Sequence, residues 1–552
     1  MQRKPNPHAL AAAFLAVSAA LSVAVLAVRN LYDDEISALN LTTSPIANIL
    51  RATAAQDVHP PGMYLLAHLA YRVVPSFRWM DLFPCLFVYA GLAIFLYQVT
   101  PLFARTRSQL CLLLLATLHP QLLLWNTTFR WYSWWTGLAL ISLTAALQPR
   151  NPRPTLGAAR ALALAVLLAC LFYLNYITFL FVVVLGAAML LRYRAQPWKR
   201  LLLPALLILG VFCALIAPQL HTMIAVHIPN GGGQLSSFAI SFLRLLQSVA
   251  TSEAYLPWHP LAILAGLLFA ALCVVGLIAR LRLLRRGAST DSTGSGLASL
   301  LLFGLLFFLL VAVTGLGGKP RNGLLLIPVL APAAALIVGT LRPRVQNAIL
   351  LFFALWSAVG IAHIVGRYGL TMASMNDRPE QVVAFVRQTA GPGCAIVVTH
   401  DTGLAFSLAQ ANLPRTLIVS PFLPPIFGGS RSLPSNDCAQ TRLYAVQSYL
   451  GASSPWTQTL GSELQSSTRF IHGQPRVDSF SFDPDARRKR GLARIPGLGG
   501  DLASAAALPD FRYVVTSGPV DRTGLEAMRK RIPDFFSSDD VIPSEAPPKP
   551  SP

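Results

Sequence analysis

Long apolar runs separated by short polar loops fill the first two thirds of the chain. Each run has about 16–22 residues, close to the length at which a helix crosses the hydrocarbon core of a bilayer. The first run is too long for a signal-peptide core and is not followed by a small-residue cleavage site, so we interpret it as a retained span. The pattern predicts about eleven membrane-spanning helices, at 9–28, 82–100, 109–125, 133–148, 161–175, 177–191, 201–217, 261–279, 297–314, 323–340 and 346–364.

A twelfth stretch, HPPGMYLLAHLAYRVVP at 59–75, is shorter and carries His68 and Arg72 one helical turn apart. If this stretch does not cross the membrane, all the basic loops share one side with the basic N-terminus, as the positive-inside rule expects of cytoplasmic segments. We therefore predict an amphipathic helix lying in the outer interface. The basic loops are those at 104–107, 149–154 with Arg160, 192–200, 280–286 and 341–344.

An odd number of spans puts everything after about 365 outside the cytoplasm. We expect a transmembrane domain at 1–365 with an acidic outer loop at 29–80, an extracytoplasmic α/β domain at 366–540 and a disordered tail at 541–552. Within the α/β domain the patterns predict strands at 393–400, 415–421 and 511–518 and a helix at 402–412. The long outer loop at 218–260 contains GGGQ and is interpreted as a mobile segment, suited to gating a site.

Composition agrees with a chain that lies mostly in lipid. Hydrophobic residues make up 54% of its 552 residues and charged residues only 12%, about half the charged fraction of a typical soluble domain. The formal net charge of +21 suggests nucleic-acid binding, but the cations lie in short loops between apolar runs, so we expect no nucleic-acid partner. Among the seven cysteines, Cys394 and Cys438 lie in the outer domain, and whether they form a disulfide there is left open.

Three consecutive acids, Asp33, Asp34 and Glu35, follow the first span in NLYDDEISALN. Acids near a bilayer are costly unless they are solvated, paired or used, and this group could simply begin a solvated helix. Asp57, in QDVHPP, makes a functional interpretation more attractive. The two prolines favour a helix start and hold Asp57 and His59 there.

These motifs resemble the GT-C superfamily of polyprenyl-phosphate-sugar-dependent glycosyltransferases. The similarity is greatest to the protein-mannosyltransferase-like branch, which also resembles the lipid A aminoarabinose transferases. Besides the acidic pair and Asp-x-His-Pro-Pro, the branch has an aromatic Arg-x-Tyr segment and a Lys-Pro-Arg element. Here they match NTTFRWYSWW (126–135) and GKPRNGLLLIPVLAP (318–332), and 376–400 resembles the start of the branch's external domain. Asn322 and Gly62 depart from the pattern, which often has Tyr and a bulkier residue at these places.

The resemblance implies catalytic roles for three carboxylates. Asp34 would be the base, with Glu35 beside it, and Asp57 would position the acceptor, the base or a metal. No cofactor is certain; a divalent metal held by Asp34 and Asp57 is left open. A carboxylate suits this chemistry because it can accept the acceptor's proton as charge develops.

Outer-face cations would stabilise the lipid phosphate that leaves. The candidates are Arg130, Lys319 and Arg321, with His59 and Tyr132 beside them as further substrate-binding residues. Anchoring in the interface explains Arg130 equally well, because Trp131, Trp134 and Trp135 form a typical aromatic belt. Lys319 and Arg321 could likewise snorkel from the end of a span.

The predicted fold class is thus a polytopic α-helical membrane protein, a GT-C-type bundle of about eleven spans with outer interfacial helices and a small C-terminal extracytoplasmic α/β domain. The expected activity is inverting transfer of a sugar from a polyprenyl-phosphate donor to a lipid, glycan or protein acceptor. We expect a multi-pass location in a bacterial inner or plasma membrane, in contact with membrane lipid. The alternatives are a transporter or flippase of a polyprenyl-linked lipid and an inactive assembly subunit.

Overall fold

The chain divides into two compact units in the computed structural model. One unit combines Met1–Arg29 with Leu41–Thr371, and the other combines Asn30–Asn40 with Met372–Pro552. The acidic segment therefore groups with the C-terminal unit rather than with the helices next to it in sequence. The described residues are 6–29, 31, 33–55, 59–76, 79–151, 154–224, 237–255, 259–285, 292–366, 378–391, 393–421, 440–448, 462–482 and 510–533.

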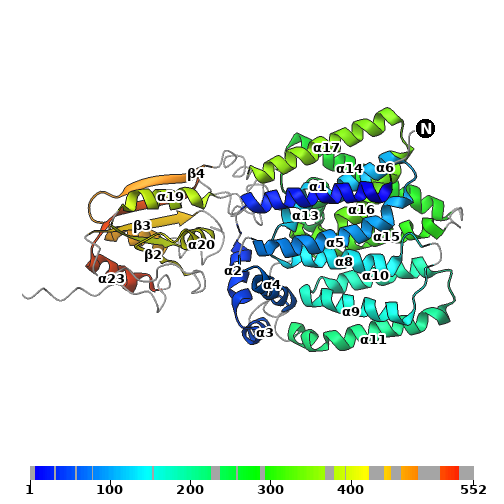
Figure 1. Ribbon diagram of the computed structural model, residues 1–552, viewed down its shortest axis with the longest axis horizontal. Helices are drawn as coiled ribbons and strands as arrows, with labels where there is room; N and C mark the ends of the chain where they lie inside the picture. The colour runs from blue at the N-terminus through cyan, green and yellow to red at the C-terminus, as the bar shows by residue number, and fades with distance from the viewer. Residues whose placement is uncertain are drawn as a thin grey trace, which may run out of the picture. The chain divides into compact units, whose positions relative to one another are not determined.

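The first unit is a bundle of helices, with α2 extending across its boundary (Figure 1). Its long helices run back and forth, so that loops collect at two ends of the bundle (Figure 1). The α-helices are α1 (Pro7–Val28), α2 (Asp33–Thr43), α3 (Ile46–Ala55), α4 (Gly62–Val73), α5 (Leu82–Val99), α6 (Thr106–Thr117), α7 (Pro120–Asn126), α8 (Trp131–Leu147), α9 (Ala158–Leu174), α10 (Thr178–Tyr193), α11 (Trp198–Thr222), α13 (Phe238–Ala250), α14 (Pro260–Arg285), α15 (Ser292–Val313), α16 (Leu326–Thr340) and α17 (Pro343–Val365). Short 3-10 turns are η1 (Trp79–Asp81), η2 (Thr100–Leu102), η4 (Leu316–Gly318) and η5 (Pro320–Gly323).

Each of the apolar runs predicted to cross the membrane is helical in this unit, and the run at 109–125 comprises two helices, α6 and α7. By length and composition, seven helical segments of the described chain can span a bilayer, namely Pro7–Val28, Trp79–Leu102, Thr106–Asn126, Trp198–Thr222, Pro260–Arg280, Ser295–Val313 and Pro343–Val365. The other predicted runs form the shorter helices α8, α9, α10 and α16. Together with the sheet of the second unit, these helices confirm the predicted fold class.

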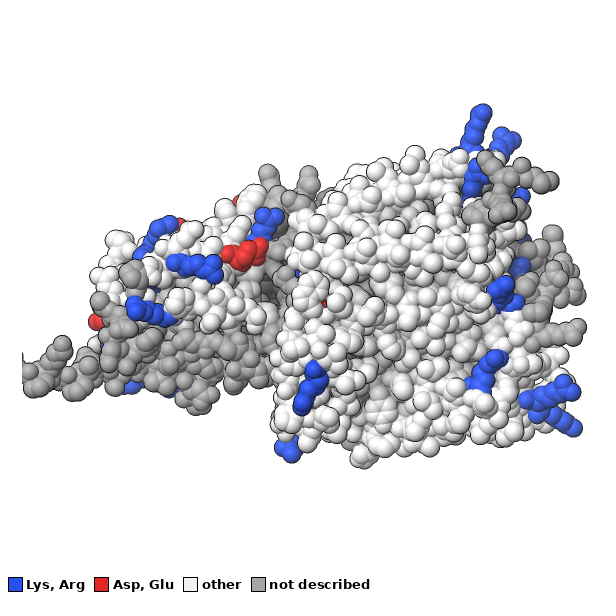
Figure 2. Space-filling model, in the orientation of Figure 1, with Lys and Arg blue, Asp and Glu red and all other residues white. Residues whose placement is uncertain are grey.

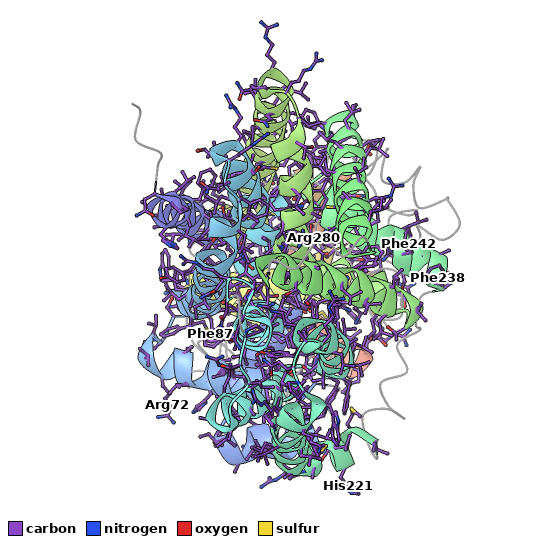
Figure 3. All side chains as sticks on the ribbon, turned by 90° about the vertical axis from the view of Figure 1, so that its right-hand side faces the viewer. Arg72, Phe87, His221, Phe238, Phe242 and Arg280 are labelled. Atoms are coloured by element: carbon purple, nitrogen blue, oxygen red, sulfur yellow. The ribbon has the colours of Figure 1, made fainter. Side chains whose placement is uncertain are left out.

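The stretch at 59–75 forms the short helix α4, which has one buried face and one exposed face. His68 is buried and its Nδ1 lies 2.8 Å from the backbone oxygen of Thr42. Arg72, one turn on, is exposed and points outward at the rim of the unit (Figure 3). With 12 residues, α4 is too short to cross a bilayer.

Basic segments distant in sequence meet at one end of the bundle, called here the basic end. The ring of His8, at the start of α1, stacks on Tyr97 at 4.3 Å, and Arg150 lies over the same ring. Arg107 Nε donates to Asn347 Oδ1 at 2.7 Å, which brings the loops at 104–107 and 341–344 together. Figure 2 shows Lys and Arg gathered at this end, beside a wide surface without charged side chains.

Helices α5 and α8 cross in direct backbone contact. A Cβ on Gly91 would lie 2.4 Å from the backbone oxygen of Gly137, and one on Gly137 would lie 2.5 Å from that of Phe87. Only hydrogen fits at these two positions. Small residues permit the same close approach between many membrane helices, where van der Waals packing is a main source of association.

Two features of this unit differ from the sequence prediction. The predicted span at 109–125 is divided into α6 and α7, because Pro120 has no N–H to continue the helix; the ring of His119 caps α7 by accepting from the N–H of Gln121. The interpretation of 218–260 as a loop is wrong over Phe238–Ala250, which forms the amphipathic helix α13. Phe238 and Phe242 of α13 lie at the edge of the bundle (Figure 3). The GGGQ segment is outside the described residues.

The second unit is built on a five-stranded mixed sheet of order β2-β1-β3-β5-β4. Strand β1 pairs in parallel with β2 and β3, whereas β5 pairs antiparallel with β3 and β4. The three predicted strands and the helix at 402–412 are present; β3 and β4 were not predicted. Its elements are α19 (Pro379–Ala390), β1 (Cys394–Thr399), α20 (Thr402–Ala411), β2 (Thr416–Val419), β3 (Thr441–Ser448), η7 (Thr468–Phe470), β4 (Arg476–Phe482), β5 (Phe511–Val520) and α23 (Arg522–Arg531).

One apolar core of this unit lies between the sheet and α23. It includes Ile396, Val398, Leu443 and Met528, all essentially inaccessible to solvent. Cys394 is disulfide-bonded; Cys438, its partner in the sequence-based hypothesis, lies outside the described residues. The predicted tail at 541–552 also lies outside them.

Candidate functional site

The predicted catalytic carboxylates fall in two separate segments. Asp33, Asp34 and Glu35 form the first turn of α2, and Glu35 is fully buried. The side chains of Asp33 and Asp34, and the whole of Asp57, lie outside the described part of the chain. Their catalytic roles, and a metal held by Asp34 and Asp57, therefore stay predictions.

Arg130 and His59 form a pair at the start of α8. Arg130 is the residue before the first turn of that helix and is 93% buried, since its exposed fraction is 7%. Its Nη2 lies 3.1 Å from His59 Nε2. A guanidinium can only donate, so the neutral His59 accepts at Nε2 and carries its proton on Nδ1. The structure thus joins two of the predicted substrate-binding residues.

Arg321 lies over two aromatic rings at the same end of α8. Its Cζ is 5.1 Å from the ring centre of Tyr132 and 5.6 Å from that of Trp125. The two rings contact each other edge to face, with centres 5.4 Å apart. Cation–π contacts of this kind stabilise a guanidinium while its N–H groups stay directed along its edge. Arg321 and Tyr132, both predicted, are brought together, and Trp125 is an addition.

The loop that carries Lys319 and Arg321 is fixed by short-range contacts. Asn322, one of the departures from the family pattern, donates from Nδ2 to the backbone oxygen of Leu316 at 2.8 Å. Lys319 is exposed at the junction of the two 3-10 turns. Asn322 therefore closes the loop from within, a role that a tyrosine side chain could not fill in the same space.

Gly62, the other departure, has a steric explanation. A Cβ at this position would lie 2.5 Å from the backbone oxygen of Tyr173 at the end of α9. The start of α4 packs directly on that backbone. A bulkier residue here would force α4 away from α9.

Glu253 is a residue of this site that the sequence reasoning missed. Its Oε2 accepts from Trp125 Nε1 and from Gln121 Nε2, both at 2.8 Å. Its own N–H donates to Gln121 Oε1 at 2.7 Å. A signal was present, because Glu253 is the only acid between Asp81 and Asp291. An isolated acid in a long apolar region needs a reason.

A buried ion pair at the same end was also missed. Arg29 Nη2 lies 2.5 Å from Asp81 Oδ2, and their side chains are 5% and 1% exposed. The pair joins the end of α1 to the turn before α5. Charges buried this deeply are tolerated only when paired, so this pair holds the two helices in register.

The two histidines at and after the end of α11 do not provide a metal site that the structure describes. His221 is exposed at the end of α11 (Figure 3), and His227 lies outside the described residues. Within the described ranges, no three His, Cys, Asp or Glu residues are grouped so that they could hold a metal ion.

Comparison with known proteins gives a match only at the level of structure. No family model matches the chain, and no curated protein sequence does. ArnT from Cupriavidus metallidurans in the apo state is similar, with a TM-score of 0.51 and 14% sequence identity over 92% of this chain and 97% of that chain. The same protein bound to undecaprenyl phosphate gives a TM-score of 0.49 at the same identity and coverage.

The resemblance to aminoarabinose transferases, found from short motifs, is thus confirmed for the fold. The likeness extends over nearly the whole of both chains, including the sheet unit at the C-terminus. The chain therefore shares the fold of ArnT.

Proposed function

We propose that this protein is a membrane glycosyltransferase that moves a sugar from a polyprenyl-phosphate donor to an acceptor on the extracytoplasmic face, with inversion at the anomeric carbon. The observation that carries the proposal is Arg321 on Trp125 and Tyr132, beside the Arg130–His59 pair. These cations lie at the end of the bundle away from the basic loops. The positive-inside rule disfavours cations there, and an anionic substrate gives a reason for them.

The fold supports the same class of donor. ArnT, which shares this fold, has been solved with undecaprenyl phosphate bound. An apolar bundle with cations at one end suits such a lipid, because the prenyl tail can stay in the membrane while the phosphate meets the guanidinium groups. Arg pairs with phosphate through two parallel N–H···O bonds, which orients the group as well as binding it.

The reaction is a single displacement. An acceptor hydroxyl attacks the anomeric carbon, the new C–O bond forms as the bond to the phosphate oxygen breaks, and the polyprenyl phosphate leaves. Asp34 takes the hydroxyl proton as positive charge grows on the sugar ring. Arg130, Lys319 and Arg321 stabilise the negative charge that develops on the phosphate. Glu35 and Asp57 support the base and the acceptor.

A transporter or flippase for the same lipid is the second candidate. Transporters usually bind substrate at mid-membrane in broken helices, often within repeated halves. Here the clustered cations lie at one end of the bundle, and no internal repeat is visible in the sequence. Enzymatic transfer therefore fits better than transport, and better than an inactive assembly role, for which the acidic pair would be unnecessary.

The decisive experiment is deletion of the gene followed by mass spectrometry of envelope glycans and lipids. Complementation with the wild-type gene should restore a lost sugar modification. Asp34→Asn should lower the transfer rate by about 100-fold to 10,000-fold, the usual range for a general base. Both proteins must be present in the membrane in equal amounts.

Asp33→Asn is the matched control, because it removes a neighbouring charge but not the proposed base. It should keep most of the activity. Full restoration by Asp34→Asn would show that the base is another residue. If deletion changes no glycan or glycolipid, the enzymatic proposal itself fails.

A further inference from the structure

Glu253 lies in a tight turn between α13 and α14, and several hydrogen bonds hold this turn in place. Ser252 adopts a left-handed conformation with φ of 73°, and its hydroxyl accepts from the N–H of Ala254 at 3.1 Å. His363 Nδ1 lies 3.1 Å from the backbone oxygen of Ala254, and Tyr255 donates to the backbone oxygen of Trp356. The turn is thus held by α17, and the Glu253 backbone has little freedom.

From this turn, the Glu253 side chain controls the position of Trp125. A single oxygen, Oε2, accepts from both the indole N–H and the Gln121 amide. Gln121 Oε1 in turn accepts from the Glu253 N–H and from the Ser252 hydroxyl. Trp125 is only 1% exposed, and the Glu253 carboxylate provides an acceptor for its buried indole N–H.

The helix that leads into the turn also holds the loop carrying Arg321. Arg244 of α13 donates from Nη1 to the backbone oxygen of Gly318 at 3.0 Å. A Cβ on Gly317 would lie 2.7 Å from the backbone oxygen of Ser241, and one on Gly323 would lie 2.7 Å from Leu245 Cδ1. One element, α13 with its terminal turn, therefore fixes both the guanidinium loop and the aromatic rings beneath it.

We propose that Glu253 is a positioning residue for the donor phosphate, acting through Trp125 on Arg321. The carboxylate holds the indole, the indole and Tyr132 hold the guanidinium, and the guanidinium binds the phosphate of the polyprenyl lipid. This inference rests on the proposed function, since it assumes that a phosphate binds at Arg321. It assigns the lone acid of 82–290 a task distinct from proton transfer.

The test measures binding of undecaprenyl phosphate to the purified full-length protein in detergent, with undecaprenol as the lipid without phosphate. Glu253→Ala should weaken binding of undecaprenyl phosphate by about 10-fold to 100-fold, the range expected for losing two hydrogen bonds to a charged group. Binding of undecaprenol should change little. Glu253→Gln should recover most of the affinity, because an amide oxygen can occupy the place of Oε2.

A double variant separates positioning from general damage to the fold. In an Arg321→Ala background, Glu253→Ala should cause no further loss, because the two residues act in series. The thermal unfolding midpoint shows whether each variant is folded. If Glu253→Ala binds like wild type, or if folded Glu253→Gln is as weak as Glu253→Ala, the inference is wrong.

Failure of the phosphate site on which the proposed function rests gives a different result. Wild-type protein would then bind undecaprenyl phosphate no better than undecaprenol. If wild type prefers the phosphate lipid and additional loss appears on top of Arg321→Ala, the phosphate site stands and only the role of Glu253 is overturned.

Discussion

The two ends of helix α8 use arginine in opposite ways. At its C-terminus, Arg192 donates to the backbone oxygens of Leu147, Gln148 and Asn151 and to the hydroxyl of Ser295. The Leu147 carbonyl is one of those that a helix end leaves without a helical partner. Here the cation completes the fold.

At the N-terminus of α8 the arginines face the wrong pole of the helix. A cation is favoured near a helix C-terminus by about 0.3–1 kcal/mol and disfavoured near the N-terminus, where the helix dipole is positive. Yet Arg130 precedes the first turn, and Arg321 lies over Tyr132 within that turn. The aromatic rings and His59 stabilise these cations, but an anion would relieve their repulsion with the helix dipole. Under the proposed function, the difference separates an arginine that serves folding from arginines that would serve a ligand.

The substitution Arg321→Ala tests most directly whether the arginines at the N-terminus of α8 serve a ligand. It should weaken undecaprenyl phosphate binding and lower transfer by about 100-fold or more, as expected when a charge-stabilising donor is removed. The thermal unfolding midpoint should stay near that of wild type. Arg321→Lys should fall between, because an ammonium keeps the charge but neither stacks as well nor binds phosphate through two bonds.

Arg192→Ala should show the reverse behaviour. Removing it leaves buried carbonyl groups without donors, which should destabilise the protein by about 2–4 kcal/mol. Affinity for undecaprenyl phosphate, measured per folded molecule at low temperature, should be unchanged. A variant that kept its unfolding temperature but lost lipid binding would contradict the division of roles.

A buried histidine of the sheet unit, His400, should have a smaller effect than either arginine, on the pH dependence of folding stability. His400 Nε2 lies 3.0 Å from the backbone oxygen of Ser448, and burial lowers the pKa of His400 although Asp401 opposes the shift. The unfolded chain therefore takes up a proton near pH 6.5 that the folded unit resists. Stability should be full above that pH and fall as the pH drops toward the lowered pKa.

His400→Gln keeps an amide donor but cannot titrate, so it should flatten this acid loss. The maximum slope attributable to one proton is about 1.4 kcal/mol per pH unit. The measurement is the thermal unfolding midpoint of wild type and variant between pH 7 and 5. Equal slopes would mean that other groups cause the acid sensitivity.

Much of the fold was predictable because it depends on local patterns. Apolar runs of sufficient length specify helices in a membrane, where the backbone must satisfy its own hydrogen bonds. Helix α13 could also have been found, since its buried residues Ser241, Leu245, Ser248 and Val249 follow helical spacing. Strand β4 could not, because it is an edge strand with largely exposed residues, and it forms only by pairing with β5.

The site was predictable only in part. Arg130, Tyr132, His59 and Arg321 were identified through motifs, and their mutual contacts follow from the bundle. Glu253 and the Arg29–Asp81 pair depend on which segments meet in space, which no local pattern specifies. The sequence does show that acidic residues are rare in this apolar region, so Glu253 can be singled out before its partners are known.

The contact of Gly91 with Gly137 has a mechanical consequence. Helix α8 has 17 residues and is therefore about 25 Å long, and the backbone contact grips it near its middle. A tilt of α8 about this contact would move its C-terminal end, beside Arg192, and its N-terminal end, at Tyr132, in opposite directions. A change at the basic loops that tilted α8 would therefore also displace the aromatic rings under Arg321, about 25 Å away.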